Sequence, residues 1–303
     1  MRIVRRTKVV IVRRTKVVIR VTMLMGPIGA LRVSVVHGLA LLLCRAGVRR
    51  EYSAVSVKVR GVDHPLLLRP ATSDLEVFKQ IFVSREYAPL DDMDAPSLVV
   101  DAGANVGYSS AYFLSRFPTT HVIALEPDPD NADVCRRNLE PYGDRARVLQ
   151  RAVWPRKTRL TILRYGHLGD RGEYGVQVVE GPLERGALPE HVHRGPNPPI
   201  PSGEVDAIDL ASIIELVGLP IDLLKMDIEK AEIPVFGNGD LTWLRRVSNI
   251  AIELHGPRAH EVFFRALDGF SYESVESGEL TICRNLVSPF ISPNRSSLTR
   301  PSG

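Results

Sequence analysis

The stretch LVVDAGANVGYSS at residues 98–110 constrains the fold more than any other part of the sequence. Its apolar start predicts a buried strand, the glycines at 103 and 107 predict a tight turn, and the polar residues that follow predict the start of a helix. A turn that leads from a strand into a helix presents backbone N–H groups to a small ligand. We therefore expect a ligand-binding loop here, with the carboxylate of Asp101 at its mouth.

Further strands are predicted at residues 121–126, 146–150, 221–226 and 248–254, with helical stretches between most of them. Strands that alternate with helices are typical of a parallel sheet covered on both faces. Ligands bind such sheets at a switch point, which we expect between the third and fourth strands. Two strand-like runs about a turn at Ser277 and Gly278 predict a terminal antiparallel hairpin. The predicted class is α/β: a Rossmann-like, mostly parallel sheet with a C-terminal hairpin and an N-terminal helical extension.

The first 22 residues repeat the octapeptide IVRRTKVV and contain eight Lys and Arg but no acid. Because β-branched residues favour helices poorly, we expect residues 1–22 to be a disordered leader; a basic arm for a membrane or nucleic acid is the alternative. Residues 23–90 are predicted to form a helical cover. The apolar stretch 31–47 lies within this cover. It predicts a packed helix or, alternatively, a helix that contacts a membrane surface. Its uncharged run of 12 residues is too short to cross a bilayer, which takes about 20.

A Ser-x-x-Glu pattern at residues 73–76 predicts that a helix starts near Asp74. The main domain is expected to span residues 91–287, with a loop-rich insertion at 155–205 that contains at most one hairpin, because proline and glycine are dense there. Residues 288–303 are expected to form a disordered tail.

Composition excludes several classes of protein. An apolar content of 44% with 24% charged residues is ordinary for a globular chain with a real core. Three distant cysteines without a C-x-x-C pair argue against a disulfide framework or zinc site and favour a cytoplasmic location. The net charge is +4, but without the leader's eight cations it becomes −4, so we expect no nucleic-acid partner. The oligomeric state stays open.

The loop's residues discriminate between cofactors. A nicotinamide dinucleotide would require G-x-G-x-x-G, but Asn105 and Tyr108 occupy the second and third glycine positions. Asp101 would also repel a pyrophosphate, by about 1 kcal/mol at 4 Å in water and by more in a cleft. S-adenosylmethionine carries positive charge and no phosphate, so it suits this carboxylate. Gly103 then allows close backbone approach, and Gly107 opens the helix without a Cβ.

Glu126, in the stretch VIALEPDPDN, ends the next strand, where a carboxylate accepts hydrogen bonds from both ribose hydroxyls of a nucleoside. The predicted residues for binding S-adenosylmethionine are Asp101, Gly103, Asn105, Gly107, Glu126, Asp128 and Asp227. A nicotinamide-dependent oxidoreductase and a catalytically degenerate S-adenosylmethionine-binding module are the alternatives.

Four stretches in order, VVDAGANVGYSSAYFLSRFP, VIALEPDPDN, IDLLKMDIEKAE and IAIELHG, resemble the FkbM-type family of S-adenosylmethionine-dependent methyltransferases. The resemblance covers roughly two-thirds of the chain, and it implies a class I methyltransferase fold. It also implies O-methylation of a sugar, polyketide or related small metabolite, with a glycolipid among the possible acceptors. The family's Asp-x-Glu-Gly-Ala-Glu reads here as residues 227–232, with Lys230 in place of the glycine.

Methyl transfer to a hydroxyl requires in-line placement and benefits from a base. Four candidates follow the fourth and fifth strands: Asp227, Glu229, Glu253 and His255. Because its intrinsic pKa is near 6.5, His255 is the expected base. The same groups suit a divalent cation, but we expect no metal. Lys225, inside an apolar strand, is expected to pair with a neighbouring carboxylate or to extend towards solvent.

Overall fold

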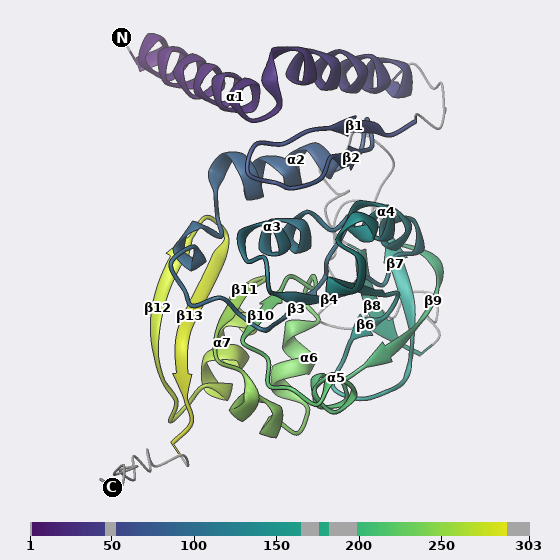
Figure 1. Ribbon diagram of the computed structural model, residues 1–303, viewed down its shortest axis with the longest axis vertical. Coiled ribbons are helices and arrows are strands. Elements are labelled where there is room, and N and C mark those ends of the chain that lie inside the picture. Colours follow the sequence, from purple (N-terminus) through teal and green to yellow (C-terminus); the bar gives the residue numbers. More distant parts are fainter. Residues whose placement is uncertain (1, 46–52, 165–175, 182–198, 290–303) are drawn as a thin grey trace, which may run out of the picture.

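The structure is a computed structural model that describes residues 2–45, 53–164, 176–181 and 199–289 (Figure 1). Its central sheet has seven strands in the order β12-β13-β11-β10-β3-β4-β5. The strands are β3 (Leu98–Ala102), β4 (His121–Leu125), β5 (Ala146–Leu149), β10 (Leu223–Met226), β11 (Ile250–Glu253), β12 (Ser271–Ser277) and β13 (Leu280–Val287). Five are parallel neighbours, and the hairpin β12–β13 joins antiparallel to β11. The predicted α/β class, the five strands and the terminal hairpin are confirmed.

Helices cover both faces of this sheet, as uninterrupted apolar strands require. Leu98, Val100 and Ala102 of β3 share one cluster with α5 (Leu210–Val217), α6 (Glu232–Gly237), α7 (Pro257–Ala266) and the 3-10 helix η4 (Thr242–Arg246). Val99 belongs to the opposite face, with α3 (Tyr108–Arg116) and α4 (Pro129–Leu139), which the 3-10 helix η3 (Glu140–Arg145) follows. The alternation puts residues 99 and 101 on the α3 face.

The switch point of the sheet lies between β3 and β10. From β3 the chain moves outward to β4 and β5, then returns to the other side of β3 for β10 and β11. Open sheets bind ligands in the crevice beyond the carboxyl ends of the two strands that flank such a point. The expectation that the third and fourth strands flank it is therefore wrong: the third strand, β5, is at the edge, and the first strand takes its place.

Residues 152–208 form a second, four-stranded sheet with the order β6-β9-β7-β8. Its strands are β6 (Ala152–Val153), β7 (Arg159–Arg164), β8 (Val176–Glu180) and β9 (Ile200–Ile208). The antiparallel pair β7–β8 fits the one hairpin that the insertion was expected to contain, whereas the extended β9 goes beyond that expectation. The strand β9 was missed because proline and glycine begin its sequence, IPSGEVDAI. Residues 165–175 and 182–198 of the predicted insertion lie outside the described residues.

The N-terminus is helical. Helix α1 (Arg2–Arg45) is interrupted by a non-helical Gly26, with φ 72°, followed by Pro27. The prediction of a disordered leader is thus wrong for residues 2–22, since no glycine or proline precedes residue 26 and β-branched residues cost a helix only a few tenths of a kcal/mol each, roughly. Most of the predicted tail, residues 290–303, lies outside the described residues.

The predicted cover joins α1 to the sheet. It contains the antiparallel pair β1 (Val55–Val57) and β2 (Leu66–Leu68), α2 (Asp74–Phe78), a π-helix η1 (Lys79–Ser84) and a 3-10 helix η2 (Ala88–Leu90). The predicted helix start at Asp74 is confirmed. The hydroxyl of Thr72 accepts the N–H of Asp74 at 3.2 Å, whereas Ser73 makes no side-chain cap bond, so the predicted capping box does not form.

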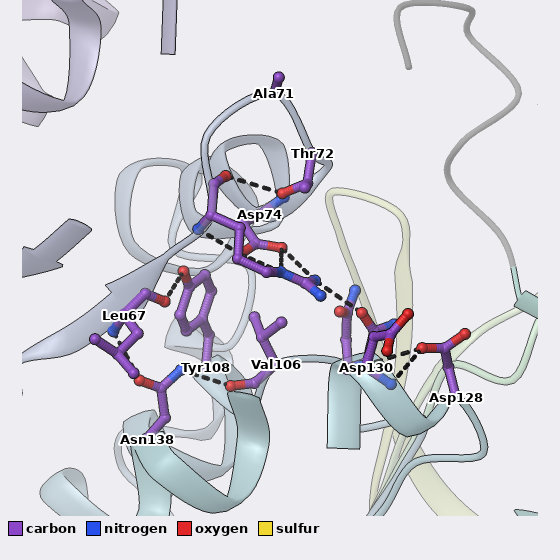
Figure 2. A network of polar contacts seen from close by, with 12 residues as sticks. Leu67, Ala71, Thr72, Asp74, Val106, Tyr108, Asp128, Asp130 and Asn138 are labelled. Carbon is purple, nitrogen blue, oxygen red and sulfur yellow. Dashed lines mark hydrogen bonds and ion pairs between the residues drawn. The ribbon is translucent and has the colours of Figure 1, made fainter. Parts of the chain in front are cut away.

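A polar network ties the cover to the helices beside the sheet (Figure 2). The Oδ1 atom of Asn138 accepts the Leu67 N–H at 2.7 Å, and its Nδ2 donates to the Val106 carbonyl at 2.8 Å. The Tyr108 hydroxyl donates to the Leu67 carbonyl at 2.7 Å. Asn138 is only 1% exposed, so its amide satisfies two backbone groups that water does not easily reach.

We expect Asn138→Leu to lower the free energy of unfolding by about 2–3 kcal/mol, because both backbone partners lose their hydrogen bond inside the protein. Chemical denaturation measures the difference. Arg137→Ala, on the exposed side of the same helix, is the matched control and should change stability by less than about 0.5 kcal/mol. Equal effects of the two substitutions would contradict the role of Asn138.

Candidate active site

A pocket of about 570 Å³, including its open mouth, lies at the switch point. The residues that line it are Gly103, Asn105, Glu126, Pro127, Asn131, Arg151, Ala152, Val153, Val176, Val178, Asp227, Ile228, Glu229 and Ala231. Of the predicted site residues, Gly103, Asn105, Glu126, Asp227 and Glu229 are therefore together at one wall.

The loop after β3 passes the end of β10 at van der Waals distance. Gly103 has φ 76°, and a Cβ on it would lie 1.7 Å from the carbonyl oxygen of Asp227. The N–H of Asn105 donates to Oε2 of Glu126 at 2.8 Å, while the Oδ1 of Asn105 is buried with no hydrogen-bond partner in the described part of the chain. Because an unpaired buried oxygen is costly, it marks a place for a ligand donor.

Asp101 lies behind this loop and not at its mouth. It is fully buried, and Lys225, its register partner on β10, places Nζ 3.1 Å from its Oδ1. The hydroxyls of Ser109 and Ser110 both donate to its Oδ2 at 2.6 Å. Asp101 does not line the pocket and its charge is paired with Lys225, although its Oδ1 has no hydrogen-bond partner among the described residues, so its contact with the cofactor stays a prediction.

Lys225 connects the ion pair to the loop. Its Nζ also donates to the carbonyl of Gly103 at 2.6 Å, so one ammonium holds the strand end and the turn together. Burial alone would lower the pKa of Lys225, but Asp101 and other nearby anions raise the pKa above its usual value, and the side chain stays charged. The expectation that Lys225 pairs with a carboxylate is confirmed.

Gly107 and Asp128 also have structural roles. Gly107 precedes α3 with φ 83°, and a Cβ there would lie 2.9 Å from the Sγ of Cys135. Asp128 caps α4 by accepting the N–H groups of Asp130 and Asn131, and it forms an ion pair with Arg164. Neither residue lines the pocket, so their predicted cofactor contacts are corrected to roles in packing and capping.

Glu126 faces the pocket at the end of β4. Burial raises its pKa to about 7, although backbone N–H groups of Asp128 and Asn105 act in the opposite direction. Each carboxylate oxygen accepts one of these N–H groups, at 3.0 Å and 2.8 Å. Since a carboxylate oxygen has two acceptor positions, both oxygens can still accept a ligand hydroxyl.

The predicted catalytic carboxylates surround His255. Its Nδ1 lies 3.2 Å from Glu232, and its Nε2 lies 3.3 Å from Glu253, 3.6 Å from Glu229 and 3.8 Å from Asp227. Burial would lower the pKa of His255, but hydrogen bonds to Glu232 and Glu253 and the surrounding negative charge raise it to about 11. A raised pKa favours the protonated ring, which argues against the expected role of His255 as base. The sequence did not single out Glu232 as the partner that orients this ring.

Glu229 carries a pKa of about 8, raised by burial and by the charge of Asp227. Its backbone and that of Lys230 are left-handed, with φ 51° and φ 75°. Glycine adopts this conformation at no steric cost, which explains why the FkbM-type motif has glycine at this position. Lys230 adopts the same left-handed backbone at a conformational cost of about 1 kcal/mol. The ligand-forming atoms of Asp227, Glu229 and His255 lie within 4.8 Å of one another, but a cation there would first have to displace the His255 proton.

Some pocket residues were not predicted from the sequence. Arg151, Ala152 and Val153 directly follow the third predicted strand, so the rule that ligands bind at carboxyl strand ends would have found them. Val176 and Val178 lie on β8, inside the loop-rich insertion, and no local signal pointed to them as pocket residues.

The strand order, the antiparallel β13 beside β11 and the pocket beyond β3 and β10 define a class I, Rossmann-like methyltransferase fold. The profile of the Methyltransferase FkbM domain matches residues 101–275. Because this match spans more than half of the chain, the protein belongs to the FkbM methyltransferase family.

The chain is also similar to several individual proteins. The 2-O-methyltransferase NoeI of Sinorhizobium fredii is 30% identical over 195 residues, which make up 64% of this chain and 75% of NoeI. The AMB antimetabolite synthetase AmbE of Pseudomonas aeruginosa is 28% identical over 202 residues, 60% of this chain. The crystal structure of methyltransferase FkbM from Methylobacillus flagellatus matches at 15% identity and a TM-score of 0.43, over 66% of this chain. This chain spans only 10% of AmbE and 47% of that structure.

We expect Asp101→Ala to lower the free energy of unfolding by about 3–5 kcal/mol, because Lys225 becomes an unpaired buried charge. In a double-mutant cycle, Asp101→Ala with Lys225→Met should cost less than the sum of the single changes, by more than about 1.5 kcal/mol. Denaturant titrations of the four proteins give the coupling. As a control, Arg258→Met breaks an exposed ion pair with Glu261 and should leave the unfolding midpoint nearly unchanged. Additive effects at 101 and 225 would contradict the buried pair.

The cationic state of His255 predicts an unusual titration. Its folded-state pKa of about 11 exceeds the unfolded value near 6.5, so its contribution to stability is complete below pH 6.5 and is lost as the pH rises towards 11. NMR of labelled histidines should show one ring, absent in His255→Gln, that titrates above pH 9. The ring of His37, whose pKa burial lowers, should titrate below 6.5 in the same sample. A midpoint near 6.5 for His255 would disprove the arrangement.

Proposed function

We propose that this chain is an S-adenosylmethionine-dependent methyltransferase that methylates a hydroxyl of a small molecule: a sugar, a polyketide or a glycolipid. The observation that carries the proposal is the buried carboxylate of Glu126 on the pocket wall, at the carboxyl end of the strand next to β3. A nucleoside places its vicinal hydroxyls at this position in Rossmann-like sheets.

The residues of the pocket fit this cofactor. Glu126 would hold the ribose, Gly103 lets the backbone approach the amino-acid part, and the unpaired Oδ1 of Asn105 would accept a donor from the ligand. Ala152 and Val153 offer apolar contact for the base.

The acidic wall argues against a dinucleotide. Because Lys225 neutralises Asp101, the charge of Asp101 no longer separates the two cofactors. Three other carboxylates, Glu126, Asp227 and Glu229, line the pocket directly, against one cation, Arg151. Like charges in a partly buried site repel strongly, so a pyrophosphate is disfavoured and a sulfonium ligand is favoured.

The cofactor supplies an electrophilic methyl group. The chain then has to place a hydroxyl in line and accept its proton. Glu229 is the group for the second task, since it lines the pocket and its pKa of about 8 makes its ionised form, the minority at pH 7, a stronger base than an ordinary carboxylate. The Nε2 atom of His255 lies 3.6 Å from the Oε2 of Glu229. That NoeI is named a 2-O-methyltransferase supports a hydroxyl acceptor.

We expect calorimetry to show S-adenosylmethionine binding and Glu126→Gln to weaken it about 10- to 100-fold, since one charged acceptor for ribose is lost. The matched control is Glu204→Gln, an exposed acid on β9, which should bind like the wild type. Absence of binding by the wild-type protein would refute the proposed cofactor.

Glu229→Gln should separate binding from chemistry. We expect its cofactor affinity to stay within about threefold of wild type, while transfer of a tritiated methyl group to hydroxyl-bearing metabolites falls by roughly 10² or more. Removal of divalent cations by EDTA should leave the wild-type rate unchanged. Wild-type turnover in the variant would exclude Glu229 as the base, and loss of activity with EDTA would favour a cation at Asp227, Glu229 and His255.

A further inference from the structure

Helix α1 exposes a continuous line of large apolar side chains. After the kink, Ile28, Leu31, Val35, Leu39 and Leu42 are between 56% and 82% exposed. On a helix with about 100° between successive residues, these five positions fall within an arc of about 80°. Large side chains aligned in this way on an outer surface mark an interaction site and not scattered surface residues.

The opposite side of the same helix is fixed to the protein. Val33 is 2% exposed and Ala40 is fully buried. The Nδ1 of His37 accepts the N–H of Ala71 at 3.2 Å, and Arg20 donates to the carbonyl of Val83 at 3.1 Å. The apolar line therefore points away from the domain while the helix stays docked, as the position of α1 outside the body of the molecule shows (Figure 1).

Charge is distributed very unevenly along the chain. Residues 1–50 contain twelve Lys and Arg and no Asp or Glu, whereas the remainder of the chain has a net charge of −8. An anionic surface would attract this end and repel the rest, so the charge orients the molecule with α1 towards such a surface.

The length of the helix decides between lying on a membrane and crossing it. The stretch Ile19–Leu43 is long and apolar enough to cross, with a mean hydropathy of 1.6 and only 17% of the most apolar window buried. The kink at Gly26, however, leaves only the segment 28–43 in line with the exposed apolar side chains; it is about 24 Å long, shorter than the hydrocarbon core of about 30 Å, and Arg32 lies within it. One side of that run is also occupied by the domain.

We propose that α1 is a membrane-docking helix that lies in the interface of an anionic lipid bilayer. The apolar line enters the acyl boundary, and the net positive charge of the first 50 residues favours the lipid phosphates. This inference does not depend on the proposed function, since it rests only on the exposed face, the docked face and the charge of the N-terminal segment.

The test is flotation of the full chain with vesicles of phosphatidylcholine that contain 30% phosphatidylglycerol. We expect the wild type to float with them at about 0.1 M salt, and to bind far less to pure phosphatidylcholine or at 1 M salt. A variant with Leu31→Gln, Val35→Gln and Leu39→Gln should bind at least tenfold more weakly. These positions are exposed, so near-ultraviolet circular dichroism should show an unchanged fold.

The matched control carries Ile200→Gln, Leu216→Gln and Leu219→Gln, three apolar residues that are similarly exposed elsewhere. It should float like the wild type. Failure of the wild type to float, or equal flotation of the α1 variant, would overturn the proposal. Sedimentation of the wild type as a dimer that the α1 variant abolishes, without vesicle binding, would also overturn it and assign the face to a second copy of the chain.

Discussion

The ion pair between Asp101 and Lys225 is the interaction on which the site depends. Two adjacent parallel strands end in opposite charges that are both fully out of solvent, and the same ammonium holds the Gly103 carbonyl of the loop that follows. An unpaired charge at this depth would cost several kcal/mol, roughly, so the sheet, the loop and the start of α3 are bound to one geometry. The loop can then approach β10 so closely that only glycine fits at 103.

A second group of charged side chains lies beyond the Asp101–Lys225 ion pair, at the carboxyl ends of the strands. Beyond Asp101, the strand ends carry Glu126, Asp227, Glu229 and Glu253, and the cation among them is the imidazolium of His255. Burial raises the pKa of Glu126 to about 7, and burial together with the charge of Asp227 raises that of Glu229 to about 8. A ligand with positive charge suits a pocket that three carboxylates and one arginine line. Burial also makes the ionised form of Glu229 a stronger base than an ordinary carboxylate.

Much of this arrangement could be predicted from the sequence, because it depends on local pattern. Apolar runs predicted the strands. The rule that ligands bind at the carboxyl ends of strands predicted Glu126, Asp227 and Glu229 as pocket residues. The surroundings of Asp101 and His255 were not predicted, because each depends on partners distant in sequence: Lys225 for the first, and Glu232 and Glu253 for the second. Helix α1 was misjudged for another reason: the penalty that β-branched residues impose on a helix was overestimated, since it is only a few tenths of a kcal/mol each, roughly. Val176 and Val178 were missed because their strand is paired through contacts that no local motif encodes.

The central claim is that the acidic pocket beyond β3 and β10 holds the nucleoside of S-adenosylmethionine. A crystal structure of the chain with S-adenosylhomocysteine tests it most directly. The account predicts both ribose hydroxyls on the carboxylate of Glu126, the base between Ala152 and Val153, and the sulfur on the side of Asp227 and Glu229. Density for the ligand at any other place, or a ribose that does not contact Glu126, would contradict it.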